Sequence, residues 1–175
     1  MTASGPAPDG VVVFLCTGNA ARSVMAGVML EAAGAPVRVV TAGTHVVERQ
    51  PTSRRTRDAL VALGLDASAH RSRQITDADL EAADLVVAMA AEHVRYVRRR
   101  HPQAAGRTAT LAWLAAHLPG GAAPLATKVA ALELAALDPD EQGDVEDPAG
   151  GDDEAYVGCA RRLTGLVAEM AARLA

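Results

Sequence analysis

Short apolar runs alternate with helix-spaced segments along this chain. Each run is rich in valine, leucine or alanine and ends at turn residues, which is typical of a buried strand. The segments between the runs place apolar residues three or four positions apart, which indicates helices. The predicted strands are residues 11–15, 37–41, 84–90 and 107–111, and the predicted helices are residues 22–33, 52–63, 76–83, 91–100, 113–118 and 152–174. Residues 119–144 combine glycines and prolines, so we expect mainly loop there, with room for one helix.

This alternation predicts an α/β fold. We expect a three-layer sandwich, in which a mostly parallel sheet of about four strands carries helices on both faces, because parallel strands need helical crossovers. With 175 residues, half of them hydrophobic, the chain is long enough for one domain with a substantial core. We place that domain at residues 10–175, after a flexible leader at residues 1–9.

The amino-acid composition limits the classes of partner that this chain can bind. The formal net charge of −4 and the aromatic content of 2% disfavour a nucleic-acid partner, which would need a basic field and stacking rings. The N-terminus lacks the features of a signal peptide, and the first apolar run is too short for membrane insertion. The two cysteines, Cys16 and Cys159, fit neither a disulfide framework nor a zinc site. We therefore expect a cytoplasmic protein.

The stretch VVVFLCTGNAARS, residues 11–23, carries the candidate chemistry. It predicts a strand that ends at Cys16, then a tight loop and the start of a helix. Ligands of such sheets bind at the carboxyl ends of the strands. Loop amides and a helix N-terminus together form an anion site, and Gly18 and Asn19 are residue types that tolerate the positive φ angles such a loop demands.

Cys16 and Arg22 give this loop a reactive character. A cysteine at the mouth of an anion site has its thiolate stabilised, which makes it a nucleophile. The planar fork of Arg22 can hold two oxygens of a tetrahedral oxyanion. The alternative is a small buried cysteine that closes a strand. The combination of cysteine, five residues, arginine and serine at a strand-to-helix junction favours catalysis over that alternative.

The loop resembles the signature of the low-molecular-weight protein tyrosine phosphatase family. The resemblance extends along the chain through TAGTH (41–45), HRSRQ (70–74) and VEDPAG (145–150). It implies that Cys16 attacks phosphorus to form a phosphocysteine, that Arg22 and the loop amides hold the phosphoryl oxygens, and that Asp147 is the general acid. The implied phosphate loop comprises Thr17, Gly18, Asn19, Ala20, Ala21 and Ser23, with no metal and no cofactor.

Within that implied site, Ser23 contacts the sulfur and Asn19 braces the loop. His70 braces the same loop from a second layer of residues. Asp138 precedes a proline as Asp147 does, but it lies farther from the final helix and lacks the glycine-containing run that follows Asp147. We expect Cys159 to pack in the core.

The resemblance implies a phosphorylated protein as partner, with phosphotyrosine favoured. The chain departs from aryl-phosphatase members because Ala149 and Gly150 follow the Asp-Pro pair where aromatic walls are usual. Two other functions remain open: an arsenate reductase that passes its adduct to an external small thiol, and a non-catalytic binder of phosphate or phosphoproteins. The oligomeric state remains open as well.

Overall fold

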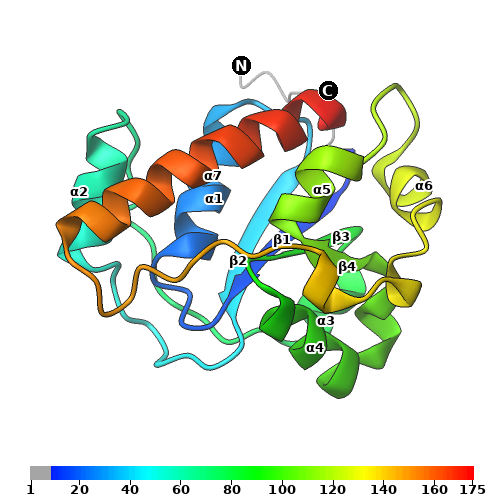
Figure 1. The fold of residues 1–175 in the computed structure, drawn as a ribbon, viewed down its shortest axis with the longest axis horizontal. Coiled ribbons are helices and arrows are strands. Elements are labelled where there is room, and N and C mark those ends of the chain that lie inside the picture. Colours follow the sequence, from blue (N-terminus) through cyan, green and yellow to red (C-terminus); the bar gives the residue numbers. More distant parts are fainter. Residues whose placement is uncertain (1–8) are drawn as a thin grey trace, which may run out of the picture.

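Four parallel strands form the centre of the structure (Figure 1). They are β1 (Val11–Cys16), β2 (Arg38–Gly43), β3 (Leu85–Ala88) and β4 (Thr108–Thr110), in the spatial order β2-β1-β3-β4. The structure is a computed structural model that describes residues 9–175. The predicted leader therefore lies outside the described residues, except for Asp9, whose amide donates to the Pro36 carbonyl at 2.6 Å.

The helices follow the predicted order. They are α1 (Arg22–Ala32), α2 (Arg54–Val61), α3 (Asp77–Ala82), α4 (Ala91–Arg100), α5 (Leu111–His117), α6 (Leu125–Ala130) and α7 (Asp153–Leu174). Three 3₁₀ turns add η1 (Pro102–Arg107), η2 (Leu134–Ala136) and η3 (Pro139–Glu141), so residues 119–144 hold more structure than the composition predicts. Helix α2 starts two residues later than predicted because the Ser53 hydroxyl caps it by accepting the Thr56 amide.

Side chains of β1 alternate between two cores. Val12, Phe14 and Cys16 join one buried cluster, which α1, α5 and α7 complete. Val13 and Leu15 join the other, which α3 and α4 complete. Every residue of β1 after Val11 is buried, as expected for a strand covered on both faces. The three-layer α/β sandwich is thus confirmed, and the sheet is entirely parallel.

The strand order creates a switch point between β1 and β3. Strand β2 lies on one side of β1, whereas β3 lies on the other and leads outward to β4. Helix α1 follows β1 and packs on one face, and α4 follows β3 and packs on the opposite face. The loops after β1 and β3 therefore border a crevice at the carboxyl ends of the strands, where α/β sheets bind ligands. No helix within residues 9–175 is long and apolar enough to cross a membrane.

Candidate active site

The loop between β1 and α1 curls at one residue. Asn19 has a φ of 50°, in the left-handed region. Of the two residues that could carry the positive φ, Asn19 does and Gly18 does not, and a Cβ on Gly18 would meet nothing within 4 Å. The glycine that the loop requires is Gly43 at the end of β2. A Cβ there would lie 2.5 Å from the carbonyl oxygen of Thr17, so any larger residue would displace the loop.

The side chain of Asn19 braces the loop from inside. It is fully buried, and its Nδ2 donates to Ser23 Oγ at 3.0 Å and to Thr41 Oγ1 at 3.1 Å. Its Oδ1 accepts the Arg73 amide at 3.0 Å, and its backbone carbonyl accepts His70 Nε2 at 2.9 Å. The predicted bracing residues thus meet at one point, which ties the loop to β2 and to the HRSRQ segment. Burial lowers the pKa of His70, which favours a neutral ring.

The sulfur of Cys16 lies 3.0 Å from the hydroxyl oxygen of Ser23. Because that oxygen accepts a hydrogen bond from Asn19, the Ser23 hydroxyl proton is free to point at the sulfur. Cys16 thus has a specific polar partner even though only 3% of the residue is exposed.

Backbone amides of the loop complete an anion site. The amides of residues 18–22 donate to no acceptor within residues 9–175, and the N-terminus of α1 adds its dipole at the same place. A cavity of about 110 Å³ opens there. It is lined by Cys16, Gly18, Ala20, Ala21, Arg22, Ser53, Asp147, Ala149 and Tyr156.

Arg22 and Asp147 meet across this cavity. Arg22 Nη2 lies 2.7 Å from Asp147 Oδ2, and Arg22 Nη1 donates to the Val145 carbonyl at 3.1 Å. The arginine side chain is 4% exposed and the aspartate side chain 46%, so the carboxylate faces the opening. The Ala149 amide donates to Asp147 Oδ1 at 3.0 Å and fixes its orientation. Asp138 instead caps η3 by accepting the Asp140 amide and does not line the cavity.

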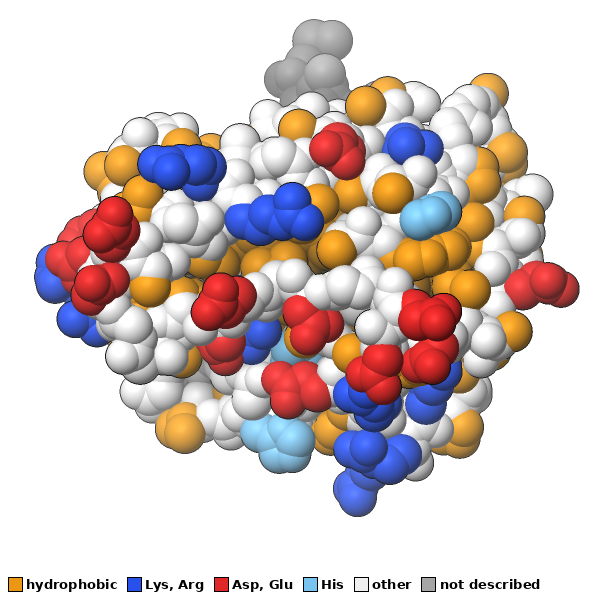
Figure 2. Space-filling view, in the orientation of Figure 1, with side chains coloured by type: hydrophobic (Ala, Val, Ile, Leu, Met, Phe, Trp, Pro, Cys, Tyr) orange, Lys and Arg blue, Asp and Glu red, His pale blue; other side chains and the backbone are white. Residues whose placement is uncertain are grey.

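Tyr156 is the one aromatic residue that lines the cavity. The guanidinium of Arg55 lies over its ring, 6.0 Å from the centroid. Ala149, beside the general-acid candidate, offers only a methyl group. Figure 2 shows acidic side chains spread over the face below α7. A larger cavity of about 440 Å³ shares Asp147 and is lined on its far side by Cys159 and other α7 residues.

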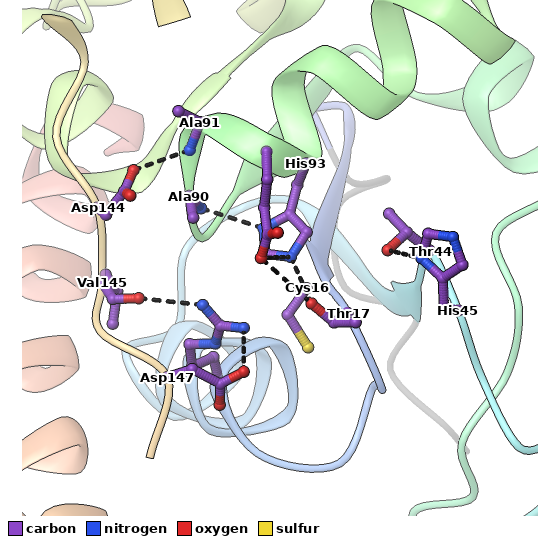
Figure 3. A network of polar contacts seen from close by, with 12 residues as sticks. Cys16, Thr17, Thr44, His45, Ala90, Ala91, His93, Asp144, Val145 and Asp147 are labelled. Atoms are coloured by element: carbon purple, nitrogen blue, oxygen red, sulfur yellow. Dashed lines mark hydrogen bonds and ion pairs between the residues drawn. The ribbon is translucent and has the colours of Figure 1, made fainter. Parts of the chain in front are cut away.

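His93 belongs to the site although no sequence motif singled it out. It lies on α4 and is 1% exposed, and its Nε2 lies 2.9 Å from Oγ1 of Thr17, the residue after Cys16 (Figure 3). Burial is the main reason that its pKa falls to about 4, and the positive charge of Arg22 lowers it further. Only the neighbourhood of β1 and β3 in the sheet brings this residue to the loop. Within residues 9–175, no three His, Cys, Asp or Glu side chains are grouped to hold a metal ion.

Known proteins resemble this chain. A family model described as low molecular weight phosphotyrosine protein phosphatase matches residues 11–118. The protein-arginine-phosphatase of Geobacillus stearothermophilus is 30% identical over 164 residues, which cover 93% of this chain and 95% of that protein. The probable low molecular weight protein-tyrosine-phosphatase EpsP of Ralstonia solanacearum is 32% identical over 95 residues, which cover 54% of this chain and 66% of that protein.

Solved structures share the fold. YwlE arginine phosphatase from Geobacillus stearothermophilus has a TM-score of 0.76 and 29% identity, covering 93% of this chain and 90% of that chain. A low molecular weight protein tyrosine phosphatase from T. tengcongensis has a TM-score of 0.72 and 31% identity, covering 92% and 97%. Wzb from Vibrio vulnificus, in complex with benzylphosphonate, has a TM-score of 0.74 at 19% identity, covering 93% and 97%, and supports the fold alone.

Proposed function

Because this chain belongs to the low molecular weight phosphotyrosine protein phosphatase family, we propose that Cys16, Arg22 and Asp147 remove phosphate from phosphorylated side chains of proteins. The chain is a cysteine-based phosphatase, and its family acts on phosphorylated protein substrates.

In the first step, the Cys16 thiolate attacks phosphorus and the bond to the leaving atom breaks. Arg22 and the free loop amides hold the non-bridging oxygens, where negative charge develops in the transition state. Asp147 donates its proton to the leaving oxygen or nitrogen, and the phosphoryl group stays on sulfur. The position of Asp147 at the opening of the cavity suits this role, because the leaving group must depart toward solvent.

In the second step, water attacks the phosphocysteine. Asp147, now a carboxylate, takes a proton from that water, and the sulfur leaves as the thiolate that began the cycle. The Ser23 hydroxyl, 3.0 Å from Cys16 Sγ, stabilises the departing sulfur. Arg22 binds the phosphoryl oxygens in both steps, so phosphate is released only after the second step.

One observation carries this assignment: Asp147 lies 2.7 Å from Arg22, although 125 residues separate them in sequence. A phosphate-binding protein would need the loop and Arg22 alone. An arsenate reductase with an external thiol would need Cys16 and an anion site, but no acid for an alkoxide leaving group. A carboxylate at the mouth of the cysteine cavity therefore favours hydrolysis of phosphorylated side chains over both alternatives.

Phosphotyrosine in proteins is the first candidate substrate, since the matching family model bears that name. Phosphoarginine is a second candidate, favoured by the rim. Ala149 has no ring to pack against the ring of a phosphotyrosine. Tyr156 is the one aromatic residue among those that line the cavity, and the guanidinium of Arg55 already lies over its ring. Asp147 can accept hydrogen bonds from the N–H groups of a phosphoarginine. The relative that covers 93% of this chain is named a protein-arginine-phosphatase. The cytoplasm remains our proposed location.

The test begins with p-nitrophenyl phosphate, in the presence of EDTA and a thiol reductant. Wild-type protein should release p-nitrophenol and Cys16→Ser should not. Matched peptides carrying phosphotyrosine or phosphoarginine then compare kcat/KM through release of inorganic phosphate. Absence of turnover by folded wild-type protein on all three substrates would overturn the proposal, and arsenate reduction with glutathione would be measured next.

A further inference from the structure

The turn between β3 and α4 contacts both halves of the proposed catalytic apparatus. Its Met89 carbonyl accepts the Val145 amide at 2.7 Å, and its Ala91 amide donates to Asp144 Oδ1 at 2.8 Å. These two contacts hold the segment that carries the general acid. On the other side, the first turn of α4, which follows directly, reaches the phosphate loop through His93 (Figure 3).

We propose that His93 is a positioning residue, which anchors the hydroxyl of Thr17 and thereby holds the nucleophile loop in place against α4. The proposal rests on the proposed function, because it concerns the same phosphoryl transfer. His93 touches no reacting atom: it does not line the catalytic cavity, and it acts through Thr17, the residue that follows Cys16.

Hydrogen bonding fixes the tautomer of His93. The Ala90 amide donates to Nδ1 at 3.1 Å, so Nδ1 carries the lone pair and the ring proton resides on Nε2. Nε2 then donates to Thr17 Oγ1 at 2.9 Å. Thr17 is consequently held at two atoms, because its carbonyl oxygen also accepts the His45 amide at 3.0 Å. Thr17 is thus tied to the segments that follow β2 and β3, the two strands that neighbour β1.

The surroundings keep the ring neutral. Arg22 and His45 oppose a positive charge on His93, Asp147 favours it, and Glu92 Oε1 lies 3.4 Å from Nε2 on the exposed side. Burial outweighs the two carboxylates, so the pKa of about 4 leaves the neutral tautomer dominant throughout the neutral range. The direction of the bond to Thr17 therefore stays constant over the pH range of a phosphatase assay.

Two substitutions of His93 test the roles of its two ring nitrogens separately. In His93→Gln the side-chain amide reaches the Nε2 position and can still donate to Thr17, whereas in His93→Asn it reaches only the Nδ1 position. We expect His93→Asn to lower kcat by about tenfold with little change in KM, and His93→Gln to stay within about threefold. The loss should be equal for phenyl phosphate and p-nitrophenyl phosphate, because the anchor serves the nucleophile and not the acid.

Thr17 provides the reciprocal test, with His93 left in place. Thr17→Val should lose about as much as His93→Asn, and Thr17→Ser, which keeps the hydroxyl, should retain activity. In the double variant the two losses should not multiply, because each removes the same contact. His117→Asn, at an exposed histidine of α5, is the matched control.

Wild-type activity in either His93→Asn or Thr17→Val, equal losses in His93→Asn and His93→Gln, or multiplying losses in the double variant would overturn the proposal. If His93→Asn does not fold, the Thr17→Val and Thr17→Ser pair decides alone. Turnover by wild type and its loss in Cys16→Ser test the proposed function separately, so the two failures are distinguishable.

Discussion

Cys16 and Cys159 show how far the surroundings of one residue type can differ within one molecule. Both thiols are buried and free. Cys16 ends a strand, faces the Ser23 hydroxyl at 3.0 Å and lies beside the N-terminus of α1. Cys159 lies within α7, where burial raises its pKa to about 11. Burial suppresses the thiolate of Cys159, whereas Cys16 has the Ser23 hydroxyl and a helix N-terminus as polar neighbours.

The larger of the two cavities is not the one that contains Cys16. Cys159 lines the space of about 440 Å³, whereas Cys16 lines one of about 110 Å³. Asp147 borders both cavities, but its carboxylate is bound to Arg22 on the Cys16 side. The smaller cavity therefore brings Cys16, Arg22 and Asp147 together. A phosphoryl group is small, so a tight cavity with many donors suits it better than a roomy one.

The largest effect should come from exchanging sulfur for oxygen at Cys16. The same exchange at Cys159 is its control. Cys16→Ser should lower kcat on p-nitrophenyl phosphate by at least about a thousandfold, because serine at this position lacks a base to activate it. Cys159→Ser should stay within about twofold, measured in the same assay. Loss of turnover in a folded Cys159→Ser protein would break the comparison.

Alkylation should distinguish the two thiols next. At pH 7 the thiolate fraction of Cys159 is on the order of 10⁻⁴, given its pKa of about 11. Iodoacetamide should therefore modify Cys16 at least about a hundredfold faster, and inorganic phosphate should slow that reaction. Mass spectrometry of tryptic peptides measures both rates. Equal rates in folded protein would contradict the assignment of Cys16 as the activated thiol.

Asp147→Asn should have an effect that depends on the leaving group. Phenyl phosphate leaves poorly without a proton, so kcat should fall by about a hundredfold, whereas p-nitrophenyl phosphate should lose less than about tenfold. Asp138→Asn is the matched control, since it changes the other Asp-Pro pair. Equal losses of kcat on both substrates would show that Asp147 is not the general acid. The reaction at Cys16 would then lack an identified group to protonate the leaving group.

The smallest effect concerns the stability of the structure around Cys16. The pKa of His93 falls from 6.5 to about 4 on folding, so the unfolded chain binds more protons between these values. This contribution is fully present above about pH 6.5 and is lost as pH falls toward 4. Between those limits the wild type should lose on the order of 2–3 kcal/mol more unfolding free energy than His93→Gln, as measured by urea titration. If the unfolding free energies of wild type and His93→Gln change with pH in parallel, His93 does not titrate in this way.

Local features of the fold and site followed from sequence. Apolar runs predicted four strands, and helix 91–100 matched α4 to the residue. The nucleophile loop was predictable because Cys16 through Ser23 are adjacent in the chain, and a strand, a curl and a helix start are each local. The sequence did not reveal which of Gly18 and Asn19 carries the left-handed turn, because both residue types tolerate it.

The sequence by itself determined the α/β alternation, the reactive loop and its resemblance to a phosphatase family, since each depends on neighbours along the chain. Only the tertiary structure decided which Asp-Pro pair reaches Arg22, why Gly43 must lack a side chain, and that His93 holds Thr17. These contacts join residues 26 to 125 positions apart, through the order in which β2, β1 and β3 align. Strand order is set by how two cores are buried at once, and no local pattern encodes it.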